Sequence, residues 1–189
     1  MQQPIATNDI TLFSSMRESQ YFDRKSARKD DKEIAKHISA FANAAGGKLV
    51  IGIEDDGEVT GFKRHGARDI ENFERAPIAL CSPSPIVRKE RIPVVNSSGE
   101  NDVVLVLDVE ASSGHVVSRA SDGEVFLRQN DKSVRQTRDQ VLALEYDKGQ
   151  RIFEDELVPD SSIDDVDHEV LNRYKKLLNT EAPDEQVLR

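Results

Sequence analysis

The N-terminal stretch ESQYFDRK, residues 18–25, gathers side chains that could bind a metal ion or a phosphate. Glu18 and Asp23 supply two carboxylates, and Lys25 lies two positions after Asp23. Carboxylate oxygens suit Mg²⁺ and Mn²⁺, and a neighbouring lysine can neutralise a phosphate. If the stretch is extended, Asp23 and Lys25 share one face, because strand side chains alternate. The alternative is a solvated, charged surface, where most charged residues of soluble proteins lie.

A second group of acidic residues follows the most hydrophobic segment of the chain. Glu54, Asp55 and Asp56 come directly after KLVIGI, residues 48–53, whose apolar run predicts a strand buried on both faces. A buried strand holds the residues at its end rigidly, so carboxylates there could build a metal site. The competing interpretation is a plain turn, because Asp-Asp-Gly is typical of turns.

Basic residues gather in two parts of the chain. The first group is Arg24, Lys25, Arg28 and Lys29, and the second is Arg119, Arg128, Lys132, Arg135 and Arg138. Lysine and arginine neutralise phosphates without reading the base sequence, so either group suits a nucleic-acid backbone. Each group could equally be a solvated face. The aromatic content of 5% and the absence of Trp argue against a stacking platform for single strands.

Other familiar chemistries lack their motifs. A phosphate-binding loop places its Gly-Lys pair at the start of a helix. Here the glycines before Lys48, at positions 46 and 47, end a predicted helix and precede a strand. The four histidines have no metal-ligand spacing, and His37 is expected to be partly packed. No serine has the strand-turn-helix surroundings of a hydrolase nucleophile. Cys81 is the only cysteine, which excludes a disulfide framework and a cysteine-based zinc site.

The acidity of the chain is concentrated at its C-terminal end. The net charge is −9, and residues 145–189 hold thirteen acidic and six basic side chains, so the rest is nearly balanced. A balanced domain can still present a basic face. No apolar run is long enough for a membrane span, and the N-terminus lacks the features of a signal peptide. We therefore expect a cytoplasmic protein with no membrane partner.

Alternating helix and strand patterns predict the elements that position these residues. The clearest helix covers residues 30–45, where Ile34, Ile38 and Phe41 repeat at helical spacing, Asp30 or Asp31 caps the start, and glycines end it. Further helices are predicted over 67–80, 137–146 and 167–178, and strands over 48–53, 59–62, 86–95, 101–110, 115–118 and 124–129. The fold class is α+β, with a mixed, largely antiparallel sheet packed with helices. Residues 14–146 form the predicted domain, and 147–189 an acidic, partly helical tail or linker.

Three segments together resemble the Schlafen AlbA_2 domain, which occurs in Schlafen proteins and in many bacterial multidomain proteins. They are ESQYFDRK, the stretch ISAFANAAGGKLVIGIEDDGEVTGF, and the later GEVFLRQNDKSVRQT. The resemblance covers about residues 14–146. It implies nucleic-acid binding and, in nuclease members, metal-dependent RNA cleavage by three carboxylates.

Matching the family pattern position by position gives Glu18, Asp23 and Asp55 as catalytic residues and as ligands of Mg²⁺ or Mn²⁺. The family commonly has Glu where this chain has Asp23, which keeps the charge but shortens the side chain and puts cleavage in doubt. The expected nucleic-acid contacts are Arg24, Lys25, Arg119, Arg128, Lys132 and Arg135. No nucleotide or organic cofactor is indicated.

Three functions follow from these features. The first is a nucleic-acid-binding module, for DNA or RNA, at the front of a regulatory multidomain protein. The second is a divalent-metal-dependent endoribonuclease that uses the three carboxylates. The third is a protein-interaction or dimerisation domain with no nucleic-acid role, which the net negative charge permits. The sequence leaves open a homodimer and an additional C-terminal domain.

Overall fold

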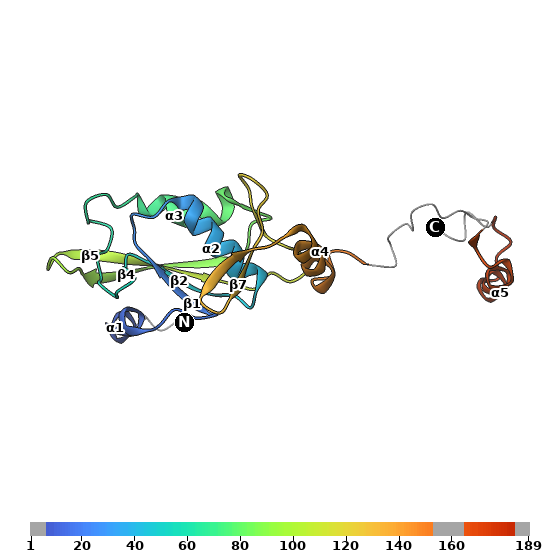
Figure 1. Ribbon diagram of the computed structural model, residues 1–189, viewed down its shortest axis with the longest axis horizontal. Coiled ribbons are helices and arrows are strands. Elements are labelled where there is room, and N and C mark those ends of the chain that lie inside the picture. The colour runs from blue at the N-terminus through green and yellow to red at the C-terminus, as the bar shows by residue number, and fades with distance from the viewer. Residues whose placement is uncertain (1–6, 153–164, 184–189) are drawn as a thin grey trace. The chain divides into compact units, whose positions relative to one another are not determined.

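The computed structural model describes residues 7–152 and 165–183, and the chain divides into one unit ending at Arg151 and a second beginning at Ile152 (Figure 1). The helices are α1 (Thr7–Ser15), α2 (Asp31–Asn43), α3 (Ile70–Ala79), α4 (Arg138–Asp147) and α5 (His168–Leu178). The strands are β1 (Phe22–Lys25), β2 (Gly47–Ile51), β3 (Cys81–Ser82), β4 (Val87–Val95), β5 (Asn101–Val109), β6 (Ser118–Arg119), β7 (Phe126–Gln129) and β8 (Lys132–Arg135).

The first unit is organised around a β1–α2–β2 segment in which the two strands pair in parallel. The helix α2 begins where Asp30 caps it by accepting a hydrogen bond from the Lys32 backbone N–H at 2.8 Å. It ends at Asn43, and the turn that follows contains Gly46, whose φ of 77° suits a glycine and whose N–H donates to the Phe41 carbonyl. The chain then enters β2 at once, so the carboxyl ends of β1 and β2 lie at the same edge of the sheet.

The main sheet has the strand order β1-β2-β5-β4. The two pairings that involve β5 are antiparallel, and β3–β6 and β7–β8 form two further antiparallel pairs. The predicted class, α+β with a mixed and largely antiparallel sheet, is confirmed.

Two hydrophobic clusters cover opposite faces of this sheet, with α2 and α3 on one side and α1 on the other (Figure 1). Leu49 and Ile51 of β2 point into the α2–α3 cluster, and Val50 between them points into the α1 cluster. All three side chains are fully buried, as the apolar run of this strand predicts. On the α1 side, the rings of Phe13 and Phe22 stack with centroids 5.8 Å apart.

The sequence patterns locate most elements and mistake a few. The return strand predicted at 59–62 is only a single bridge between Ile53 and Val59, because the Thr60 and Gly61 N–H groups both donate to the Gly52 carbonyl and turn the chain. The strand predicted at 115–118 is reduced to the two residues of β6. The patterns missed α1, β3 and β8.

The folded unit extends beyond the predicted boundaries of residues 14 and 146. At the N-terminal side, Phe13 of α1 is buried. At the C-terminal side, two hydrogen bonds join the residues directly after α4 to the segment before β6. Lys148 Nζ donates to the Ser112 carbonyl at 2.6 Å, and the Val116 N–H donates to Gln150 Oε1 at 2.7 Å. Residues 147–151 therefore belong to the first unit.

The second unit contains α5, which occupies the predicted position. Asp167 caps it through hydrogen bonds from the N–H groups of Glu169 and Val170, and Asn179 ends it in the left-handed conformation. Within residues 7–152 and 165–183, no helix is both long and apolar enough to cross a membrane.

Truncation tests this boundary. A chain ending at Arg151 should unfold cooperatively and close to the Tm of the first unit in the full chain. A chain ending at Tyr146 should unfold about 4–8 °C lower, because it loses two hydrogen bonds worth about 1 kcal/mol each. Differential scanning calorimetry of both truncations measures the difference, and equal Tm values would place residues 147–151 outside the folded unit.

Candidate functional site

Two adjoining hollows lie where β1 and β2 end and α2 begins. In open α/β sheets, ligands bind at the carboxyl ends of parallel strands, so this edge is the natural place for a site. The first hollow is lined by Arg17, Glu18, Arg24, Lys25, Asp55 and Asp131. The second is lined by Ser26, Arg28, Lys29, Glu54 and Asp55. Asp55 belongs to both, and we call the two hollows together the crevice.

Asp23 lies beneath the crevice, fully buried, with both carboxylate oxygens in contact with basic side chains. One oxygen, Oδ1, accepts a short hydrogen bond from Lys25 Nζ. The other, Oδ2, accepts from Arg128 Nη1 at 2.6 Å and lies 3.0 Å from His37 Nδ1. Burial acts to raise the pKa of Asp23, but the hydrogen bond and charge of His37, followed by the other neighbours, hold it well below its usual range.

Arg128 joins the β7–β8 hairpin to the outer edge of β1. Its guanidinium is fully buried and donates to the Ser19 carbonyl from Nε and Nη2, and to the Phe22 carbonyl from Nη2 at 3.1 Å. The same group lies over the ring of Phe41 in α2, 4.8 Å from its centroid. Arg128 therefore holds three elements together from the interior.

Arg24 has a similar structural role on the α1 side of the sheet. Its Nη1 donates to the carbonyls of Phe13 and Ser14 at 3.1 and 2.6 Å, and its Nη2 donates to the Asp55 carbonyl at 3.0 Å. The side chain thus fixes the end of α1 against the turn after β2. This turn carries the carboxylate of Asp55 to the exposed rim of the crevice.

Glu18 stands half-buried between Lys25 and Asp23. Lys25 Nζ lies 3.2 Å from Glu18 Oε1. Burial, and then the hydrogen bond and charge of Asp23, raise the pKa of Glu18, and Lys25 offsets this only in part. Ionisation of Glu18 is therefore less favourable here than in a free side chain, whereas ionisation of Asp23 is more favourable.

Glu54 and Asp55 are neighbours in sequence with different roles. Burial acts to raise the pKa of Glu54, but hydrogen bonds from Ser26, Thr60 and Arg28 lower it. These donors lie 2.8, 2.9 and 3.1 Å from its oxygens, so Glu54 is an ionised anchor in the wall of the crevice. Asp55 is exposed, and only its backbone carbonyl is held.

The predicted three-carboxylate metal site does not fit this geometry. Glu18 and Asp55 line one hollow, but an ion bound by Asp23 would have to displace Lys25, Arg128 or His37 from its oxygens. In the part of the chain that the structure describes, no group of three His, Cys, Asp or Glu side chains is arranged to hold a metal. We therefore derive no chemical step through a metal ion.

The predicted phosphate contacts divide into buried and exposed residues. Lys25 lines the crevice, and Lys132 is exposed on β8. Arg119 and Arg135 both pair with Glu124, at 2.8 and 3.0 Å. Arg24 and Arg128, also predicted as phosphate contacts, donate hydrogen bonds inside the protein, and of the two only Arg24 lines the crevice.

Sequence reasoning missed Arg17, which lies next to Glu18 in the chain and lines the same hollow. It also grouped Glu54 with Asp55 because both follow β2. The structure separates them, because Glu54 accepts hydrogen bonds from Ser26 and Arg28, whereas the Asp55 side chain is exposed. His37 is packed, as predicted, but against Asp23 rather than in an apolar core.

The buried pair of Asp23 and Arg128 can be tested by a double-mutant cycle. Asp23→Asn and Arg128→Met should each lower the free energy of unfolding by about 3–5 kcal/mol, because each removes one partner of a buried ion pair. The double variant should lose clearly less than the sum of the two. Urea denaturation measures all four proteins, and strictly additive losses would show that the two side chains do not interact.

The raised pKa of Glu18 predicts a pH-dependent gain in stability on neutralising it. Ionising Glu18 costs folding free energy as the pH rises from its ordinary pKa of 4.5 through the raised value. Glu18→Gln keeps a neutral side chain of similar shape, so it should be more stable than the wild type at about pH 7 and equal to it at about pH 4. Denaturation at both pH values measures this, and a difference independent of pH would contradict it.

Comparison with known protein families identifies the family of this chain. The family model described as Schlafen, AlbA_2 matches residues 18–137, well over half of the chain. The solved structure of the DIP2311 protein from Corynebacterium diphtheriae is similar, with a TM-score of 0.47 and 19% identity over 88% of this chain, which spans 31% of that protein. A comparison with the curated proteins finds no match. The match across β1, α2, β2 and the β7–β8 hairpin shows that this chain belongs to the Schlafen AlbA_2 family.

Proposed function

We propose that this protein binds nucleic acid through the phosphate backbone, with the crevice as its contact surface. The observation that supports this is the position of Arg17 and Lys29. Both are exposed, line the crevice on either side of Asp55, and make no ion pair with an acidic residue in the described part of the chain. Cations placed in this way can neutralise successive phosphates.

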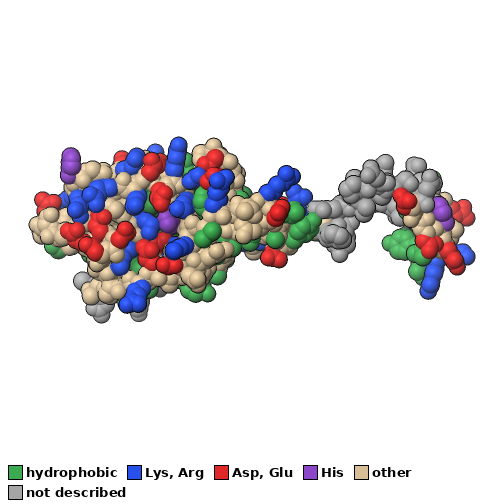
Figure 2. Space-filling model, in the orientation of Figure 1, with side chains coloured by type: hydrophobic (Ala, Val, Ile, Leu, Met, Phe, Trp, Pro, Cys, Tyr) green, Lys and Arg blue, Asp and Glu red, His purple; other side chains and the backbone are tan. Residues whose placement is uncertain are grey.

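The mixture of acidic and basic side chains around the crevice determines the affinity and the salt dependence of binding. Acidic and basic side chains are interspersed over the face of the first unit seen in Figure 2. Many exposed bases are already paired, for example Arg88 with Glu110 at 2.7 Å and Arg91 with Glu74 at 2.6 Å. We therefore expect moderate affinity with a steep salt dependence and little base specificity.

Binding without cleavage is the form of this function that the contacts favour. The endoribonuclease alternative needs three carboxylates around an ion, and the oxygens of Asp23 are taken by basic side chains. Glu18 and Asp55 remain at the rim, where their charge limits how closely a phosphate approaches. The sequence pattern of the protein thus resembles that of the nuclease members, but the buried carboxylate of Asp23 binds basic side chains that stabilise the fold.

Charge reversal in the crevice tests the proposal. Arg17→Glu combined with Lys29→Glu should weaken binding to labelled transfer RNA and to duplex DNA at least about tenfold, and lower the slope of log K against log salt by about 2. The control is Lys89→Glu with Arg138→Glu, which changes the net charge equally at exposed positions outside the crevice. Fluorescence anisotropy at low salt measures all three proteins.

Three outcomes decide between the functions. Loss of affinity in the crevice variant alone supports the proposal. No binding by the wild type at low salt, or equal affinities of the crevice variant and the control, would reject it. Incubation of the same nucleic acids with Mg²⁺ or Mn²⁺, with and without EDTA, should leave them intact, and cutting that EDTA abolishes would restore the nuclease alternative.

A further inference from the structure

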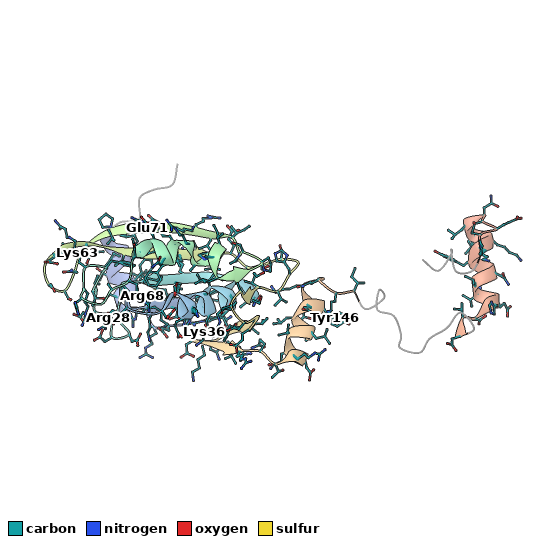
Figure 3. All side chains as sticks on the ribbon, turned by 90° about the horizontal axis from the view of Figure 1, so that it is seen from above. Arg28, Lys36, Lys63, Arg68, Glu71 and Tyr146 are labelled. Atoms are coloured by element: carbon teal, nitrogen blue, oxygen red, sulfur yellow. The ribbon has the colours of Figure 1, made fainter. Side chains whose placement is uncertain are left out.

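A third hollow adjoins the crevice and is formed by two loops far apart in sequence. Lys63, Arg64 and His65 come from the loop after β2, and Ser97 and Ser98 come from the turn between β4 and β5. All five residues are exposed. Figure 3 shows Lys63 toward the same end of the first unit as Arg28 and Arg68. The hollow thus offers basic and hydroxyl donors, beside the carboxylates of Glu58 and Glu100 that also line it.

Asp102 fixes the two loops against each other from the interior. Its Oδ1 accepts from the Phe62 N–H at 3.1 Å, and its Oδ2 accepts from the Lys63 N–H at 2.9 Å and from Asn96 Nδ2 at 3.1 Å. Asn96 Oδ1 in turn accepts from the Ser98 N–H at 3.0 Å. Burial acts to raise the pKa of Asp102, but these backbone donors lower it, so the anchor is ionised. The backbone at Lys63 and at Ser98 is therefore fixed through the same two side chains, Asp102 and Asn96.

Glu54 joins this hollow to the crevice. Its Oε1 accepts from Thr60 Oγ1 at 2.9 Å and lies 3.7 Å from Arg64 Nη1, and both partners line the third hollow. Its Oε2 accepts from Arg28 Nη2 at 3.1 Å, on the crevice side. Gly66 lies beside the Arg28 side chain, where an added Cβ would stand 3.7 Å from Cδ. Glu54 therefore contacts residues that line the third hollow and residues that line the crevice, so the two lie next to each other.

We propose that Lys63, Arg64 and His65 form a second phosphate-contact site, which takes the continuation of a nucleic-acid backbone bound in the crevice. This inference rests on the proposed function and extends it, since it names the ligand as a chain of several nucleotides rather than a nucleotide or a strand end. The ion pairs of Arg64 with Glu54 and Glu58 are partly exposed, so Arg64 can exchange them for a phosphate at little cost. The hydroxyls of Ser97 and Ser98 supply further donors to phosphate oxygens.

Oligonucleotide length separates the two contact sites. The probes are labelled single-stranded RNA and DNA of about 4 and about 16 nucleotides, the range of short single-strand sites. Lys63→Glu should weaken binding of the long probes about tenfold and lower their salt slope by about 1, with no change for the short ones. Arg17→Glu combined with Lys29→Glu should weaken both lengths. Lys89→Glu on β4 is the control with the same change of charge.

A second variant guards against a folding defect, because Lys63 Nζ also donates to the Asn101 carbonyl. Ser98→Asp adds a negative charge to the same hollow and leaves that contact in place, so it should reproduce the effect of Lys63→Glu on the long probes. The inference is overturned if both variants bind the long probes as the Lys89→Glu control does, or if they weaken the short probes equally. If the wild type binds no probe, the proposed function itself fails, whereas loss only in the crevice variant rejects the second site alone.

Discussion

The structure depends on the buried contact between Asp23 and Arg128. Through it the β7–β8 hairpin is fixed to β1, and the guanidinium is also held against the ring of Phe41 in α2. A buried ion pair contributes little net stability compared with apolar side chains of the same volume, but it penalises every arrangement that separates its partners. The pair therefore specifies where the hairpin sits. Lys25 binds the other oxygen of Asp23 and also donates to Glu18, so the same cluster of side chains orients Glu18 in the crevice.

This structural use of Asp23 determines what the crevice can do. A carboxylate that already accepts from lysine and arginine has no free oxygen for a cation, and exchanging those partners would expose a buried charge. The residues left for a ligand are those of the rim, where Arg17 and Lys29 face outward and Glu18 and Asp55 lie between them. Such a mixed rim attracts a polyanion through a few cations, so salt and local geometry control its affinity more than net charge does.

The sequence predicted local structure well and long-range contacts poorly, for physical reasons. The periodic apolar residues of α2, its capping aspartate and the glycines that end it are adjacent in the chain, so their pattern can be read directly. The pairing of Asp23 with Arg128 joins residues 105 positions apart, and no local pattern signals that an arginine will be buried. The family resemblance identified Glu18 and Asp55, which do share a hollow, but it could not show that the shorter Asp23 is taken by basic partners. The helix α1 was missed because it is short, and Ile10 and Phe13, which pack on the sheet, make too brief a pattern for a periodic signal.

Two buried carboxylates, Asp23 and Asp102, hold the fold together, which leaves the exposed side chains to contact a ligand. Each has a lowered pKa and is held by several donors, and each joins segments that are far apart in sequence. At Gly61, with φ of 62°, an added Cβ would stand 2.3 Å from Asp102 Oδ2, so the turn leaves no room for a larger residue and no freedom to shift. Loops fixed before a ligand arrives lose little conformational entropy on binding it. A surface with few unpaired cations can therefore still bind a phosphate backbone, because the loops that carry these cations are already ordered and lose little conformational entropy on binding.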